Sequence, residues 1–70
     1  MITPELLAAE PMLRFFRFEH LPPHLQATSK PLAATAVLMV ETLPRNAERT
    51  AGLRKLLEAK DCFVRAAIEE

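Results

Sequence analysis

The chain has 70 residues, with 9 basic and 9 acidic side chains, 2 histidines, 1 cysteine and 1 glycine. This length allows one domain at most, and the balanced charge argues against a non-specific binder of DNA or other nucleic acids, which needs a clear basic excess. One cysteine excludes an internal disulfide, and with two histidines it does not make a standard structural zinc set.

Half of the residues are hydrophobic. A chain this short and apolar, without disulfides or metal, is expected to bury the excess against copies of itself or another partner. The longest uncharged run, Pro31 to Val40, is too short to span a bilayer, which takes roughly 20 residues. The chain does not begin with a positively charged stretch followed by an apolar one, so we expect no signal peptide, no membrane partner and a cytoplasmic location.

The N-terminal arm is expected to occupy residues 1–20. A single glycine leaves no Asn-Gly turn for a hairpin of strands, which favours an all-α fold. Thr3-Pro4-Glu5 is typical of a helix start, with a capping hydroxyl, a proline in the first turn and an acid beside it. Pro11 ends or bends this helix. Phe16 and Phe18 alternate with charged neighbours, which predicts an extended segment over residues 14–19.

The first long helix is predicted over residues 22–43, after Pro22-Pro23. Pro31 removes one backbone hydrogen bond inside it, so we expect a kink or a restart near Ser29. Between residues 32 and 40 the only polar side chain is Thr35. A helix that is apolar on nearly every side is expected to be buried on nearly every side.

The second long helix is predicted over residues 47–68, with Asn46 as its N-cap and Glu48 in its first turn. At about 100° per residue, its apolar side chains fall in one arc roughly 140° wide. They are Leu53, Leu56, Leu57, Phe63, Val64, Ala67 and Ile68. The chain is therefore predicted to be a single all-α domain, a helical hairpin with a short N-terminal arm, that assembles into a homo-oligomer.

Arg49 and Lys60 project into this apolar arc. A cation there costs several kcal/mol unless it is paired or reaches water. Two interpretations stay open: the side chains snorkel or pair with acids such as Glu41 and Glu48, or they meet an anionic ligand at a subunit interface. By contrast, Arg54 lies four residues before Glu58 on the opposite side, as expected for a solvated pair.

Two further clusters contain candidate binding residues. Phe15-Phe16-Arg17-Phe18, with His20 nearby, is either a clamp that packs over the hairpin or a platform on which a nucleobase stacks beside cations. Ser29-Lys30-Pro31 brings a hydroxyl, an ammonium group and exposed amides to the predicted helix restart, which favours a phosphate contact.

No catalytic set is recognisable in the sequence. His20, His24 and Cys62 have no spacing that places a nucleophile beside a base, so we predict no enzyme. Pro22-Pro23 between the histidines argues against a metal site, and Cys62 is read as a small hydrophobic residue. No cofactor is expected.

Two stretches of the sequence resemble a known family. They are Phe16-Arg17-Phe18-Glu19-His20-Leu21-Pro22-Pro23 and, after the apolar helix, Leu43-Pro44-Arg45-Asn46-Ala47-Glu48-Arg49-Thr50-Ala51-Gly52-Leu53-Arg54-Lys55-Leu56-Leu57-Glu58-Ala59-Lys60. They are similar to the phage helical-hairpin family of cyclic-nucleotide sponges, the inhibitors of the CBASS and Thoeris antiphage systems. The resemblance covers roughly residues 15–68.

The resemblance implies a hexamer of hairpins that sequesters cyclic dinucleotides and cyclic trinucleotides without cleaving them. It would act in the cytoplasm of the host and let a phage evade CBASS-type immunity. The implied site residues are Phe16 or Phe18 for base stacking, Lys30, Arg49 and Arg54 for phosphates, and Thr50 or Ser29 as hydroxyl donors. This chain has phenylalanine where some members have tyrosine, and Pro31 stands beside Lys30.

Two alternatives from other functional classes stay open. The first is a helical oligomerisation or protein-interaction module with no nucleotide ligand, which would bury residues 32–40 against another protein. The second is a small hydrolase. Recovery of an intact ligand after binding separates a sponge from a hydrolase, and the absence of binding favours the interaction module.

Overall fold

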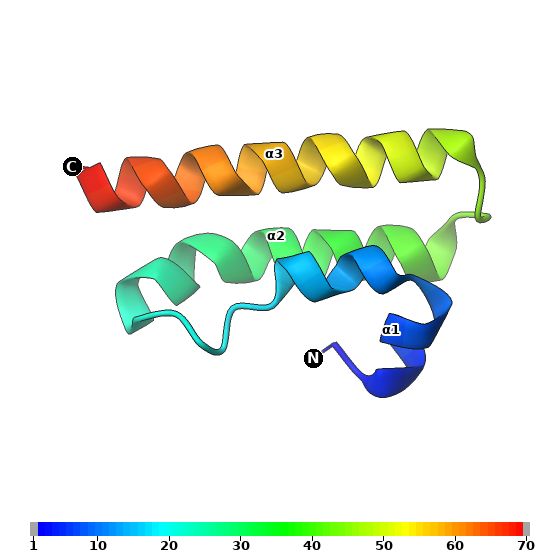
Figure 1. Cartoon of the computed structure of the whole chain (residues 1–70), viewed down its shortest axis with the longest axis horizontal. Helices are drawn as coiled ribbons and strands as arrows, with labels where there is room; N and C mark the ends of the chain where they lie inside the picture. The colour runs from blue at the N-terminus through cyan, green and yellow to red at the C-terminus, as the bar shows by residue number, and fades with distance from the viewer. Residues whose placement is uncertain (1, 70) are drawn as a thin grey trace.

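The computed structural model describes residues 2–69, and within that range every regular element is helical and no strand occurs. The elements are α1 (Pro4–Ala9), a 3-10 helix η1 (Pro11–Phe16), α2 (Pro23–Thr42) and α3 (Ala47–Glu69). Helices α2 and α3 run antiparallel, and the arm formed by α1 and η1 lies along them (Figure 1). The predicted all-α class is confirmed.

The arm begins as the sequence predicts and then departs from it. The Thr3 hydroxyl accepts a hydrogen bond from the Leu6 N–H at 3.2 Å, and α1 ends at Ala9, two residues before Pro11. The predicted extended segment over residues 14–19 is wrong in its first half, because residues 14–16 belong to η1. A 3-10 helix has about three residues per turn, so it places Leu13 and Phe16 on one face, and both are fully buried.

Helix α2 is continuous from Pro23 to Thr42 with Pro31 inside it, so the predicted restart near Ser29 is wrong. The first turns are inclined to the rest of the helix (Figure 1), in agreement with the kink that was the other expectation. Ser29 and Ala33, on either side of Pro31, are both fully buried. Packing of the helix on both sides of the proline keeps the two parts in one element, although Pro31 supplies no backbone N–H.

The connection between α2 and α3 follows the predicted signals. Leu43 is extended and precedes Pro44, which ends α2. Asn46 Oδ1 then accepts a hydrogen bond from the Arg49 N–H at 2.9 Å, and Asn46 is thus the N-cap. Helix α3 reaches Glu69, one residue beyond the predicted end.

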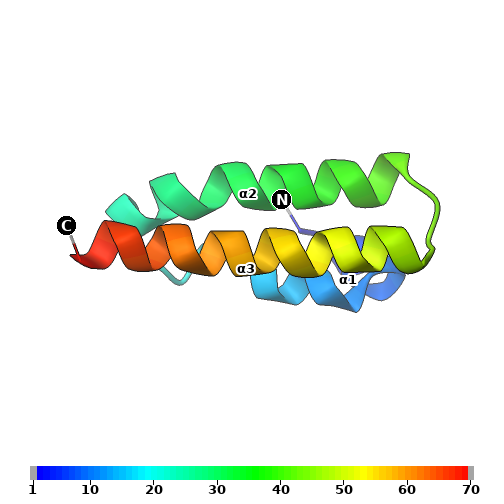
Figure 2. The ribbon, with the colours of Figure 1, turned by 90° about the horizontal axis from the view of Figure 1, so that it is seen from above.

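The core lies where η1 packs against both long helices. Seen from above, α2 and the arm lie on either side of α3 (Figure 2). The buried hydrophobic residues that form this cluster are Leu13, Phe16, Phe18, Ala33, Ala36, Val40 and Leu53.

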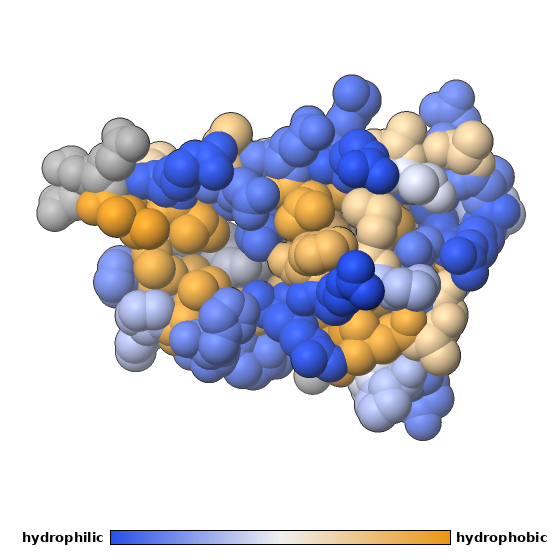
Figure 3. Space-filling model, viewed as in Figure 1, coloured by the Kyte–Doolittle hydropathy of each residue, from blue (hydrophilic) through white to orange (hydrophobic). Residues whose placement is uncertain are grey.

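Within one chain α2 is buried on one side only, and its burial on the other sides, which was expected to need further copies, stays a prediction. Ala33, Ala36 and Val40 face the core, whereas Pro31, Ala34 and Leu38 are exposed. The apolar arc of α3 is also only partly covered, since Phe63 and Ile68 are 54% and 59% exposed. Hydrophobic surface gathers over the C-terminal part of α3 (Figure 3).

Phe15 and Phe16 provide a matched test of this packing. Phe16 has no exposed surface, whereas Phe15 is 46% exposed. Phe16→Ala is expected to lower the free energy of unfolding by about 3–5 kcal/mol, because it leaves a cavity in the core. Phe15→Ala is expected to cost less than about 1 kcal/mol. Urea denaturation of both variants measures the difference, and equal losses of stability would contradict the burial of Phe16 in the core.

Candidate functional site

Arg49 is buried, with 8% of its surface exposed, and both terminal nitrogens of its guanidinium are engaged inside the chain, whereas Nε has no hydrogen-bond partner among the described residues. One terminal nitrogen, Nη2, lies 2.9 Å from Oε1 of Glu10, a carboxylate that is itself buried. The other, Nη1, donates to the carbonyl oxygens of Val40 at 3.2 Å and Leu43 at 3.1 Å. The cation in the apolar arc is therefore neutralised by an acid of the arm, and not by Glu41 or Glu48.

Two other cations of the hairpin also hold the arm. Arg45 Nη1 donates to the carbonyl oxygen of Ala9 at 3.0 Å, beside the Arg49–Glu10 pair. Lys60 Nζ donates to the carbonyl oxygen of Phe15 at 2.9 Å and lies 3.1 Å from Asp61 Oδ1. The arm is thus attached at both ends of η1, and Lys60 snorkels from the apolar arc to the surface.

The aromatic residues divide between the core and the surface. Phe16 and Phe18, the residues predicted to stack on a base, are 0% and 7% exposed. In this structure they form the packing clamp, and their faces are not open to a ligand. The ring at the surface is that of Phe15, with the guanidinium carbon of Arg14 4.7 Å from its centroid.

The remaining predicted site residues lie apart from one another. Lys30, Thr50 and Arg54 are exposed, whereas Ser29 is fully buried and its hydroxyl has no hydrogen-bond partner within the described residues. Because a helix rises 1.5 Å per residue and Arg49 lies level with Val40, Lys30 is about 15 Å from Arg49 along the hairpin. One chain therefore does not hold a phosphate between them. The described side chains also contain no ion pair between Arg54 and Glu58.

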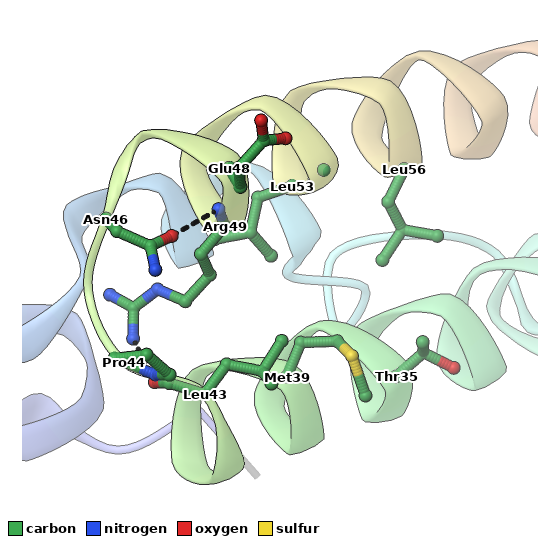
Figure 4. A pocket seen from close by; sticks show the side chains of 10 residues that line it. Thr35, Met39, Leu43, Pro44, Asn46, Glu48, Arg49, Leu53 and Leu56 are labelled. Atoms are coloured by element: carbon green, nitrogen blue, oxygen red, sulfur yellow. Dashed lines mark hydrogen bonds between the residues drawn. The ribbon is translucent and has the colours of Figure 1, made fainter.

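A groove of about 400 Å³ opens between α2 and α3 near their connection. Its lining includes Met39, Leu43, Leu53 and Leu56, with Glu48 and part of Arg49 at one end (Figure 4). A Cβ atom placed on Gly52, which also lines the groove, would meet nothing within 4 Å. The groove fits an apolar group better than a phosphate.

A second cleft, of about 320 Å³, lies between the arm and the C-terminal half of α3. The residues that line it are Arg14, Phe15, Arg17, His20, Leu21, Lys60, Asp61, Val64 and Arg65. Four of these side chains are cations and one is a carboxylate. This cleft was not predicted from the sequence, because residues 14–19 were expected to be extended, whereas residues 14–16 lie in η1 and Arg17 follows it directly. The three-residue spacing of Arg14 and Arg17, one 3-10 turn, is the signal in the sequence that points to the cleft.

Glu19 follows the aromatic stretch and fixes the end of the arm. Its carboxylate accepts a hydrogen bond from the Phe18 N–H at 3.3 Å. Hydrogen bonds from its own backbone N–H, and then from that of Phe18, lower the pKa of the Glu19 carboxyl. The side chain therefore stays charged beside the cationic cleft at neutral pH.

The histidines and the cysteine do not gather into a site. In the described part of the chain, no three His, Cys, Asp or Glu side chains lie together in a way that suits a metal ion. Cys62, read as a small hydrophobic residue, is exposed, and Arg65 Nη2 donates to its sulfur at 3.4 Å.

Across residues 2–69, no helix has both the length and the apolar character needed to cross a membrane. No family model matches the sequence, and comparison with curated proteins and with solved structures finds no match.

Removal of the Arg49 guanidinium tests its structural role. Arg49→Met leaves Glu10 charged and buried without a partner, so the free energy of unfolding is expected to fall by about 3–5 kcal/mol. Arg54→Met, on the exposed surface of the same helix, is expected to change it by less than about 0.5 kcal/mol. Chemical denaturation checks both values. An Arg49→Met variant as stable as the parent would show that the pair does not hold the arm.

Proposed function

We propose that the protein binds and sequesters cyclic oligonucleotide messengers without cleaving them, as an assembly of several copies, and that it thereby lets a phage evade CBASS-type immunity. Cyclic dinucleotides and cyclic trinucleotides are the proposed ligands, the host cytoplasm is the proposed location, and a hexamer is the assembly that the family resemblance implies. The proposal combines that resemblance with two observations: α2 has an exposed, uncharged face, and the proposed phosphate ligands lie apart from one another in a single chain.

The exposed face of α2 is the observation that carries the proposal. Ala27, Pro31, Ala34 and Leu38 recur at helical spacing, and all four are exposed. No charged residue occurs between Lys30 and Glu41. An uncharged stripe of this length on a chain of 70 residues favours burial against another copy.

Assembly would also explain why the proposed phosphate ligands are dispersed in one chain. Lys30 lies beside the uncharged stripe on α2, whereas Thr50 and Arg54 lie on α3 and share a face because they are four residues apart. If copies associate through α2, the Lys30 ammonium of one chain would come near Thr50 and Arg54 of the next chain. Arg49, which is committed to Glu10, is assigned a structural role in this proposal.

One observation favours a second function, a helical interaction module with no nucleotide ligand. The buried Arg49 cation needs no ligand, because Glu10 neutralises it within the chain. The groove beside Gly52 and the exposed ring of Phe63 would then serve contacts with another protein.

Incubation with a panel of cyclic dinucleotides and trinucleotides separates these functions. A sponge is expected to remove the ligand from solution and to release it intact after heat denaturation, as measured by chromatography. Conversion of the ligand would establish a hydrolase instead. A protein that leaves the whole panel free in solution would support the interaction module.

Alanine variants of the exposed cations test the proposed ligand residues. A charge-assisted phosphate contact contributes about 1.5–3 kcal/mol, so Lys30→Ala and Arg54→Ala are each expected to weaken binding by roughly 10- to 150-fold. Lys55→Ala, another exposed cation on α3, is the matched control and is expected to change binding less than about threefold. Isothermal titration gives the constants. If Lys30→Ala and Arg54→Ala bind as tightly as the parent, these residues are not the ligands.

Leu38→Lys tests the proposed assembly. The Leu38 side chain is 51% exposed in one chain, so the substitution leaves the hairpin folded but places an unpaired charge in the proposed interface. Light scattering at micromolar concentration is expected to show an oligomer for the parent and smaller species for the variant. A monomeric parent would contradict the proposal.

A further inference from the structure

The cleft between the arm and α3 is the place where the described part of the chain concentrates positive charge. Arg14 and Arg17 enter from the arm, and Lys60 and Arg65 enter from α3. The two arm residues are 43 or more positions from the two α3 residues in the sequence. The hydrogen bond from Lys60 to the Phe15 carbonyl oxygen holds the two segments together. A local field of this kind binds small anions even though the net charge of the chain is zero.

No ion pair engages the two cations of the arm in the described part of the chain, although the charged Glu19 carboxylate lies beside the cleft, two residues after Arg17. Neither Arg14 nor Arg17 forms an ion pair with any side chain among residues 2–68. The single carboxylate of the cleft, Asp61, is already paired with Lys60 at 3.1 Å. Guanidinium groups gathered in this way repel one another, and a bound anion would relieve that repulsion. Guanidinium groups are also well suited to phosphate oxygens, which they contact through two parallel N–H bonds.

The cleft also offers an aromatic surface. Phe15 contributes a half-exposed ring to its lining, with the guanidinium carbon of Arg14 4.7 Å from the ring centroid, whereas the rings of Phe16 and Phe18 are buried. Any nucleobase can stack on such a ring, whatever polar groups the base carries, because every base has a π-face. An aromatic ring bordered by four cations therefore fits a ligand that combines a base with a phosphate.

The size of the cleft limits that ligand. Its volume is about 320 Å³, near the lower end of the ~300–1,000 Å³ range of small-molecule pockets. This space suits one nucleotide, and a ligand built from two or three would extend far outside it.

We infer that this cleft is a nucleoside monophosphate site, complete within one chain, in which Arg14, Arg17 and Arg65 bind the phosphate and Phe15 stacks on the base. The site is separate from the proposed ligands Lys30, Thr50 and Arg54, and the inference does not depend on the sequestration of cyclic oligonucleotides. Lys60 positions the cleft by holding the Phe15 backbone.

Isothermal titration with adenosine 5′-monophosphate at low ionic strength tests the inference. Arg17→Gln is expected to weaken binding about tenfold or more through loss of a charged phosphate contact. Phe15→Leu is expected to weaken it about fivefold or more through loss of stacking. Lys55→Gln removes an exposed cation of α3 that lines neither cavity and is expected to leave binding within about twofold. Adenosine and inorganic phosphate, which each lack half of the ligand, are expected to bind more weakly than the nucleotide.

Amide shifts in a proton–nitrogen NMR spectrum locate the bound nucleotide independently of the variants. Changes confined to residues 14–21 and 60–65 would support the inference, and changes around the groove at Gly52 would overturn it. The inference also fails if the nucleotide does not bind, or if Arg17→Gln and Phe15→Leu both bind it like the parent. Binding by Lys30→Ala distinguishes the two proposals, because that variant is expected to keep the mononucleotide and lose the cyclic ligand.

Discussion

The structure depends on how the chain neutralises one guanidinium that its sequence places on an apolar helix face. Arg49 belongs to the first turn of α3, and Leu53, one turn further along the same face, is buried. Its charge is compensated by the carboxylate of Glu10 and by the carbonyl oxygens of Val40 and Leu43. Those carbonyls lie at the C-terminal end of α2, where backbone oxygens lack helical partners and where a positive charge is favourable. One side chain thus joins the arm, the end of α2 and the start of α3.

The position of the arm then determines which surfaces remain open. Because the arm occupies one side of the hairpin, the residues of α2 that face it are buried and those on the outer side stay exposed. The same placement brings Arg14 and Arg17 against α3 and creates the cationic cleft. The uncharged stripe and the cleft are therefore two results of a single docking arrangement, and they suit different partners: a second copy of the chain for the stripe and a small anion for the cleft.

The sequence predicts the parts of this structure that depend on nearby residues. Thr3 and Asn46 cap the helices that follow them, Pro11 and Pro44 stand where helices have ended, and α3 extends only one residue further than expected. These features were predictable because each depends on residues within one or two helical turns. The resemblance to the sponge family adds an expectation about function that these local features do not test.

The features that the sequence did not predict all depend on contacts between distant residues. Alternation of Phe16 and Phe18 over four positions suggested an extended segment, but the chain forms a 3-10 helix there that buries Leu13 and Phe16 on one side. The unusual position of Arg49 was visible in the pattern, whereas its partner Glu10 was not, since no local spacing links them. The same is true of the cleft, where Lys60 and Phe15 are joined across 45 positions.

The way in which the arm is attached also has a consequence for the order of folding. The hydrogen bonds that hold the arm span 36, 39 and 45 residues, whereas each long helix is closed by local bonds, and the four-residue connection joins the two. Local contacts form faster than distant ones because they close shorter loops. The hairpin is therefore the element that assembles first, and the N-terminal residues dock on it last, although they leave the ribosome first. During synthesis, the Glu10 carboxylate is therefore solvated by water until Arg49 has left the ribosome and can pair with it.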